Sequence, residues 1–151
     1  MDGERVAAAP LEWRHTLEAL DWNELSRLYE IAPLGTKKPA DLQVVFSNSL
    51  FKCLVYEDGR LVGAGRAVAD GLDCSYICDV AVHPDCQGIG LGKAIVAKLV
   101  ELSRGHRKII LYAVAGKEPF YKKLGFKRMR TAMAIFGNEQ QAFERGLIDE
   151  S

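Results

Sequence analysis

The chain has 151 residues, of which 48% are hydrophobic and 26% charged, and this size and composition suit one soluble globular domain with a core. Its 20 basic and 20 acidic residues cancel, which argues against a general nucleic-acid-binding protein because such proteins carry a basic excess. No run approaches the roughly 18–20 apolar residues of a membrane span, and the start shows no signal peptide. We therefore expect a cytoplasmic protein that binds neither nucleic acid nor membrane.

The first helix signal lies at Asp21, a good N-cap residue that is followed three residues later by Glu24 in capping-box spacing. An apolar stripe then predicts a helix that continues to about Ile31. Residues 33–39 predict a loop by their Pro and Gly content, and residues 40–47 are a candidate second, short helix.

Strand signals begin at residue 51. Asp58-Gly59 is a strong hairpin turn signal between two apolar segments, and the segment that ends at Val82 is nearly all apolar apart from Asp79, as in a buried central strand. The predicted elements from here are strands at 51–57, 61–69 and 75–82, a helix from about 90 to 104, a strand at 108–113, a short helix at 118–124, a strand at 126–136 and a polar tail, 137–151, for which no element is predicted.

This order of elements predicts the fold class. Helices that follow buried strands imply an α/β layer structure with some parallel pairing, whereas the hairpins make another part of the sheet antiparallel. We expect a single domain over residues 1–151, with a mixed central β-sheet and helices on both faces.

The four cysteines give no sign of a metal site. They form no C-x-x-C pair and no histidine cluster accompanies them, so we expect no metal and interpret them as small core residues or incidental thiols. They are Cys53, Cys74, Cys78 and Cys86.

Three glycines at alternate positions, Gly88, Gly90 and Gly92, precede the predicted helix. A nucleotide-binding P-loop needs four residues between its first glycine and a G-K-[ST] end, but three separate Gly88 from Gly92, and Ala94 replaces the hydroxyl. The dinucleotide fingerprint needs a glycine where Lys93 stands. Both phosphate motifs fail on spacing, and the simple alternative is a tight turn that caps a helix.

A different motif does fit. The pattern Gln87-x-x-Gly90-x-Gly92, directly after a strand and opening a helix, resembles motif A of the GCN5-related N-acetyltransferases (GNAT), where the loop binds the pyrophosphate of acetyl-coenzyme A. Backbone N–H groups at a helix start suit an anion, and glycine permits its close approach. Downstream, residues 117–126 (KEPFYKKLGF) are similar to the family's F-Y-x-K-x-G-F element. The two motifs together cover about residues 74–136.

The resemblance implies acetyl-CoA as cosubstrate. The pantetheine amides are expected to pair with Val80 and Val82 like an added strand, and a main-chain N–H near Val82 to polarise the thioester carbonyl. Val114-Ala115-Gly116 departs from the family, since many members carry an asparagine there that contacts the pantetheine arm. The expected cofactor-binding residues are Val80, Ala81, Val82, Gln87, Gly88, Ile89, Gly90, Leu91, Gly92, Lys93, Phe120, Tyr121 and Lys123.

The resemblance also implies direct acetyl transfer to an amine, with Tyr121 as the acid that protonates the leaving thiolate. The alternative is that Tyr121 only packs the short helix, with Phe120 and Phe126 as neighbours.

Two further titratable residues are candidates for proton transfer. Asp79 is expected to bind the acceptor ammonium or relay its proton; alternatively it is a structural carboxylate that accepts hydrogen bonds from a neighbouring loop or from Arg66. His83 precedes Pro84 and is interpreted as part of a turn rather than as a base.

The expected function is acetyl-CoA-dependent N-acetylation of a small primary amine, of arylalkylamine or amino-sugar type. The alternatives are a protein or peptide N-acetyltransferase and a non-catalytic acyl-CoA sensor or interaction module. Trp22, Tyr29, Phe46 and Tyr56 either form core or shape an acceptor pocket. The oligomeric state stays open; dimers are common in such folds, and the predicted C-terminal strand is the candidate contact in a homodimer.

Overall fold

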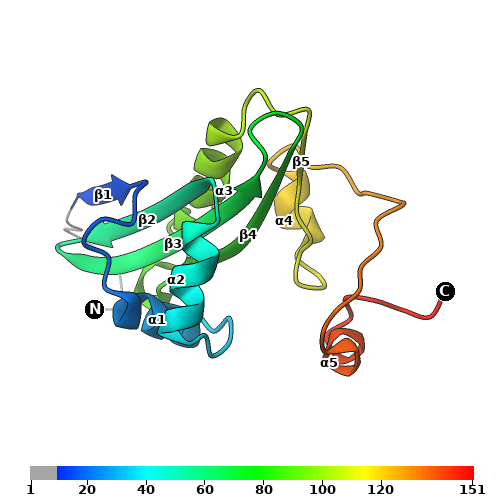
Figure 1. Cartoon of the computed structure of the whole chain (residues 1–151), viewed down its shortest axis with the longest axis horizontal. Coiled ribbons are helices and arrows are strands. Elements are labelled where there is room, and N and C mark those ends of the chain that lie inside the picture. Colours follow the sequence, from blue (N-terminus) through cyan, green and yellow to red (C-terminus); the bar gives the residue numbers. More distant parts are fainter. Residues whose placement is uncertain (1–9) are drawn as a thin grey trace. The chain divides into compact units, whose positions relative to one another are not determined.

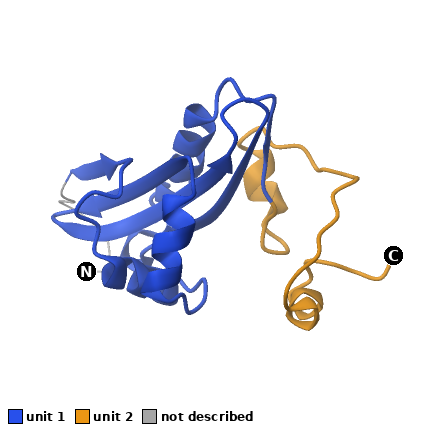
Figure 2. Cartoon of the chain, viewed as in Figure 1, with its two compact units in different colours: residues 1–111 blue, residues 112–151 orange. Residues whose placement is uncertain are grey.

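The computed structural model describes residues 10–151. It divides into two compact units, residues 1–111 and residues 112–151 (Figure 2). The sequence predicted one domain over residues 1–151.

The first unit is built around one five-stranded sheet (Figure 1). The strands lie side by side in chain order, antiparallel from β1 to β4, and β5 pairs parallel with β4. They are β1 (Leu11–Arg14), β2 (Phe51–Glu57), β3 (Arg60–Ala69), β4 (Cys74–Val82) and β5 (Lys108–Ile110). The predicted mixed sheet is confirmed.

Helices cover both faces of this sheet, as predicted. α1 (Trp22–Ile31) and α2 (Pro39–Ser47) lie on one face, and α3 (Leu91–Leu102) lies on the other (Figure 1). The core under α1 and α2 includes Leu54 and Tyr56 of β2, and these alternate with residues that point toward α3.

Aromatic residues fill the core on the α1–α2 side. The rings of Tyr29 and Phe46 are fully buried, with centroids 6.5 Å apart, and Trp22 meets Phe46 edge-on at 6.4 Å. Tyr56 is 5% exposed. These four side chains form core, one of the two roles that the sequence left open.

The N-terminus of α1 is capped as the sequence predicted. The Asp21 carboxylate accepts the backbone N–H groups of Asn23 at 2.9 Å and Glu24 at 3.2 Å. Glu24 does not complete a capping box, because its carboxylate accepts the N–H of Leu61 at 2.9 Å. The side chain thereby joins α1 to the start of β3.

The turns between strands also follow the sequence signals. Asp58 and Gly59 have φ values of 51° and 76°, the left-handed conformation of a two-residue hairpin turn. After β3, the Asp70 carboxylate accepts the backbone N–H groups of Leu72 and Asp73, and these bonds lower the pKa of Asp70 to about 2.

Two glycines of β3 let α3 approach the sheet closely. A Cβ on Gly63 would lie 2.8 Å from Ile95 Cδ1, and a Cβ on Gly65 would lie 2.9 Å from Ile95 Cγ2 and 3.0 Å from Leu99 Cδ1. These side chains already fill the space between helix and sheet, so a larger residue has no room there. The segment was predicted as a strand, but the close approach of α3 was not predicted.

The second unit contains α4 (Glu118–Lys122) and α5 (Glu139–Glu144). The predicted strand at 126–136 is wrong, because these residues join no sheet, and Met133 and Ile135 are almost fully exposed. A strand needs a partner for its backbone groups, and β-forming composition alone does not supply one. The tail holds α5, whose N-cap Asn138 accepts the N–H of Gln141 at 3.0 Å.

Over residues 10–151, no helix is both long and apolar enough to cross a membrane.

We expect Gly65→Ala to lower the free energy of unfolding by about 1–3 kcal/mol, because its methyl group overpacks the interface between β3 and α3. Urea unfolding measures the change. Gly92→Ala is the control at the same interface, since its Cβ would lie 3.5 Å from Val82 Cγ2, an ordinary contact. Equal stability of Gly65→Ala and the unmodified protein would contradict the packing argument.

Candidate active site

The central strand β4 carries a β-bulge. A register shift between Ala64 and Arg66 of β3 places Asp79 and Val80 opposite the single residue Gly65. Asp79 has a φ of 56°, a left-handed conformation that Asp adopts more readily than most residues. The carboxylate predicted to act in the site therefore belongs to the bulged backbone itself.

Residues from three other segments surround this bulge. The Tyr29 hydroxyl donates to the backbone oxygen of Asp79 at 2.6 Å, and burial raises the pKa of Tyr29 well above its ordinary value, so the hydroxyl remains a donor. Arg66 Nε donates to Asp79 Oδ2 at 2.8 Å, and its Nη1 donates to Ser49 Oγ at 3.2 Å. Lys37 Nζ lies 3.6 Å from Asp79 Oδ1. The Arg66 contact that the sequence named as an alternative for Asp79 is present.

β5 pairs only with the first part of β4, before the bulge. The parallel ladder contains three residue pairs and ends where Tyr76 meets Ile110. On the opposite edge, the N–H of His83 donates to Val62 O at 2.8 Å. Because backbone groups alternate between the two edges of a strand, those of Val82 face the edge that β5 has left.

The segment that contains Gly88, Gly90 and Gly92, here called the glycine segment, leads into α3 without a side-chain cap. Gly88 and Gly90 have φ values of 86° and 85°, and Gly90 is the N-cap residue of the helix. The first helical hydrogen bond joins the N–H of Ala94 to Gly90 O at 3.0 Å. The backbone N–H groups of residues 91–93 precede it and have no acceptor within the helix, so they are directed toward any anion that binds there.

The glycine segment is fixed to the end of β4. Gln87 Nε2 donates to Val82 O at 3.1 Å and contacts Ala32 O at 3.4 Å. The helix start is also close to the strand, since a Cβ on Gly92 would lie 3.5 Å from Val82 Cγ2. The uncapped start of α3 and the part of β4 that β5 does not pair with therefore adjoin at the C-terminal end of β4.

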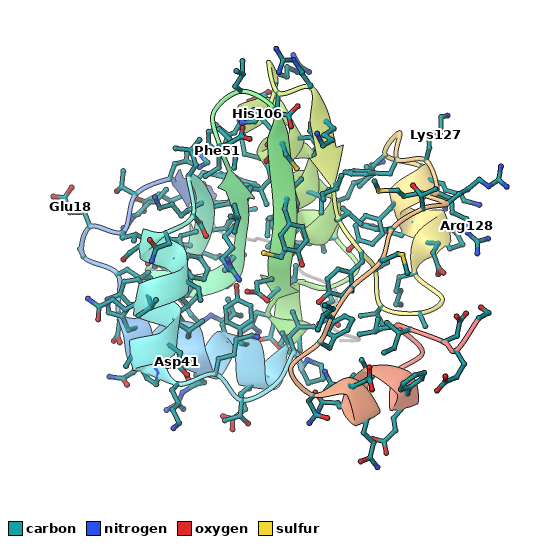
Figure 3. All side chains as sticks on the ribbon, turned by 45° about the vertical axis from the view of Figure 1, so that its right-hand side comes forward. Glu18, Asp41, Phe51, His106, Lys127 and Arg128 are labelled. Atoms are coloured by element: carbon teal, nitrogen blue, oxygen red, sulfur yellow. The ribbon has the colours of Figure 1, made fainter. Side chains whose placement is uncertain are left out.

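The two histidines near α3 have structural contacts at opposite ends of the helix. His83 caps the short 3₁₀ helix η1 (Pro84–Cys86), where its Nδ1 accepts the N–H of Asp85 at 3.1 Å. His106 follows the C-terminal end of α3, where its ring meets Phe51 edge-on at 5.8 Å (Figure 3). Its Nε2 accepts the N–H of Gly71 at 3.0 Å.

Two thiols of the first unit, those of Cys53 and Cys78, are poor nucleophiles. Burial raises the pKa of Cys53 to about 12 and that of Cys78 to about 11, so both are protonated at neutral pH. Over the described residues, no three His, Cys, Asp or Glu side chains gather as metal ligands would.

In the second unit, Tyr121 lies on α4 between two aromatic rings. Its centroid is 5.0 Å from that of Phe120 and 6.1 Å from that of Phe126, both edge-on. Burial raises the pKa of the Tyr121 phenol, which favours the protonated form. Lys123 is the C-cap residue of this helix.

The structure thus brings together part of the predicted site. Residues 80–82 and 87–93 meet at the end of β4, beside Asp79, whereas Phe120, Tyr121 and Lys123 belong to the second unit. Lys37 and Ser49 were not predicted as partners around the carboxylate. No local signal marks them, because Lys37 stands in a loop and Ser49 in the short connection between α2 and β2.

The chain was compared with known proteins. Residues 15–126 match the family described as "Acetyltransferase (GNAT) family". An uncharacterized N-acetyltransferase, ycf52, of Pyropia yezoensis is 42% identical over 119 residues, which are 71% of this chain and 68% of that protein. Serotonin N-acetyltransferase 2, chloroplastic, of Oryza sativa subsp. japonica is 41% identical over 88 residues, and the match spans 55% of this chain but only 44% of the rice protein.

A solved structure shares the fold. The crystal structure of a putative acetyltransferase from Deinococcus radiodurans superposes with a TM-score of 0.75 at 24% identity, covering 87% of this chain and 92% of that chain.

We expect Tyr29→Phe to lower the free energy of unfolding by about 1 kcal/mol, because the backbone oxygen of Asp79 loses its donor. It should also speed hydrogen exchange of the Val80 amide, next to the strained residue. Urea unfolding and amide exchange measure the two effects. Unchanged exchange at Val80 would show that the Tyr29 hydroxyl does not hold the bulge.

Proposed function

The chain belongs to the acetyltransferase (GNAT) family, and we propose that it transfers an acetyl group from acetyl-CoA directly to the primary amine of a small molecule. The observation that carries the proposal is the uncapped start of α3 beside the open edge of β4, because these suit the two ends of one extended ligand. Helix N–H groups suit a pyrophosphate, and strand backbone groups suit the amides of a pantetheine arm.

The proposed cofactor site follows from this arrangement. The N–H groups of residues 91–93, with Gly88 and Gly90 before them, hold the pyrophosphate, and Val80 and Val82 pair with the pantetheine amides. Gln87 positions the loop through Val82 O. The cofactor contacts expected of Phe120 and Lys123, which belong to α4 of the second unit, stay predictions.

Two side chains supply the proposed proton chemistry. Tyr121 donates a proton to the departing thiolate, which its raised pKa supports because burial favours the protonated phenol. Asp79 binds the acceptor ammonium and accepts its proton through water. Arg66 supports this role by fixing one oxygen of the carboxylate at 2.8 Å.

An acceptor of arylalkylamine or amino-sugar type is proposed. The rice relative bears the name serotonin N-acetyltransferase, which supports an arylalkylamine. We also propose that both compact units belong to one acetyltransferase domain, supported by the family match, which continues across their boundary to residue 126.

The cytoplasmic address stays a prediction, and the rice relative is named chloroplastic. A homodimer also stays a prediction. Its candidate contact is lost, because the predicted C-terminal strand does not form.

An amine panel with acetyl-CoA tests the function by release of the coenzyme A thiol. We expect turnover with small primary amines such as 2-phenylethylamine or glucosamine 6-phosphate. Turnover with peptide amines alone would favour the protein-acetyltransferase alternative. Tight coenzyme A binding without thiol release from any amine would favour the sensor alternative.

Matched glycine variants test where the cosubstrate binds. Gly90→Ala and Gly105→Ala introduce a methyl group at positive φ, 85° and 98°, at opposite ends of α3. Only the first should weaken coenzyme A binding, by tenfold or more as an order of magnitude, because it alone disturbs the proposed pyrophosphate loop. Equal affinities of the two variants for coenzyme A in calorimetry would exclude this loop as the site.

We expect Tyr121→Phe to lower kcat by roughly 10²-fold, as the loss of a general acid does, with little change in coenzyme A affinity. Since burial raises the pKa of Tyr121, the unmodified enzyme should lose activity through this group only at a pH above the ordinary pKa of a tyrosine. Steady-state kinetics from pH 7 to 10.5 measure both effects. An unchanged kcat would leave Tyr121 with packing alone.

A further inference from the structure

The two cations beside Asp79 hold its carboxylate unequally. Arg66 Nε bonds Oδ2 at 2.8 Å and is itself fixed by Ser49. Lys37 Nζ lies 3.6 Å from Oδ1, which exceeds the 2.7–3.2 Å of an N–H···O hydrogen bond. Oδ1 therefore keeps acceptor capacity for a closer cationic partner.

The surroundings of the Lys37 ammonium are those of an ammonium-binding site. Besides the carboxylate, Nζ lies over the ring of Tyr29, 5.4 Å from its centroid. A carboxylate together with an aromatic face attracts alkylammonium groups generally. The side chains of Lys37 and Asp79 are 29% and 23% exposed, so this place is accessible from solvent.

The side chain of Lys37 can move away from Asp79, whereas its backbone is fixed. Its backbone oxygen accepts the Ser26 hydroxyl at 2.5 Å, which ties the loop to α1. The flexible four-carbon stem carries the ammonium.

The charge around Asp79 disfavours two ammonium groups at once. The groups that face it are the cations of Arg66 and Lys37, the hydroxyl of Tyr29 and the Cys78 thiol, which is neutral because burial raises its pKa to about 11. Two positive charges already meet one negative charge. An incoming ammonium can bind Asp79 Oδ1 closely only when the Lys37 ammonium has moved away from it.

We infer that the Lys37 ammonium occupies the place of the protonated acceptor amine and competes with it, so that Lys37 sets the affinity for cationic acceptors. This inference rests on the proposed function, in which Asp79 binds the acceptor. Lys37 is thus a specificity-determining residue that raises the KM of alkylamines.

Lys37→Met tests the inference, because methionine retains an apolar stem and removes the competing charge. We expect KM for 2-phenylethylamine to fall about three- to fivefold, as for loss of one partly exposed ion pair, with kcat and KM for acetyl-CoA unchanged. Affinity for aniline, which is uncharged at neutral pH, should not change. Lys37→Arg keeps the charge and should behave as the unmodified protein does.

Lys38→Met is the matched control, because it removes a neighbouring positive charge from an exposed side chain at the start of α2. It should leave amine KM unchanged. Equal gains in Lys37→Met and Lys38→Met, or an equal gain for aniline, would show only a general charge effect and overturn the inference.

Calorimetric binding of 2-phenylethylamine to the coenzyme A complex separates this inference from the proposed function. Tighter amine binding by Lys37→Met supports the competition even if no amine releases thiol, an outcome that would refute only the proposed function. If the unmodified protein and Lys37→Met both turn over the amine, with identical amine KM and identical amine affinity, only the role of Lys37 is refuted. Failure of both proteins to bind the amine overturns the inference as well.

Discussion

A hydrogen bond from the buried hydroxyl of Tyr29 holds β4 in a conformation that a regular strand does not adopt. Water cannot replace the Tyr29 hydroxyl as the donor, because the side chain of Tyr29 is completely buried. With Arg66 on the carboxylate, this bond keeps Asp79 at positive φ and places two residues opposite Gly65. A bulge re-aims the side chains and backbone groups beyond it, so the direction of the strand end depends on this bond.

The geometry at the end of β4 follows from that constraint and from close packing of α3. Gly63 and Gly65 admit the side chains of Ile95 and Leu99, which brings the helix against the sheet. The start of the helix then lies beside Val82, where Gln87 fixes the glycine segment to the strand. One ligand can therefore meet backbone N–H groups of the helix and the strand edge together.

The elements that the sequence predicted well are those with local chemistry. Asp21 caps α1, and Asp58-Gly59 turns the first hairpin. Each signal depends on one or two residues and their own backbone. The strand predicted at 126–136 failed, and the four-residue β1 was not predicted, because strands depend on partners that composition does not reveal.

The mixed α/β fold, its principal turns and the glycine segment at the start of α3 could be predicted from sequence, because their signals lie in residues close together in the chain. How Asp79 is held could be seen only in the packed structure. Its partners Tyr29, Lys37 and Arg66 come from separate segments, and the Tyr29 contact spans 50 residues. No local pattern records such a contact, since the energy of a buried hydrogen bond or ion pair depends on distances that exist only after the sheet and helices have packed.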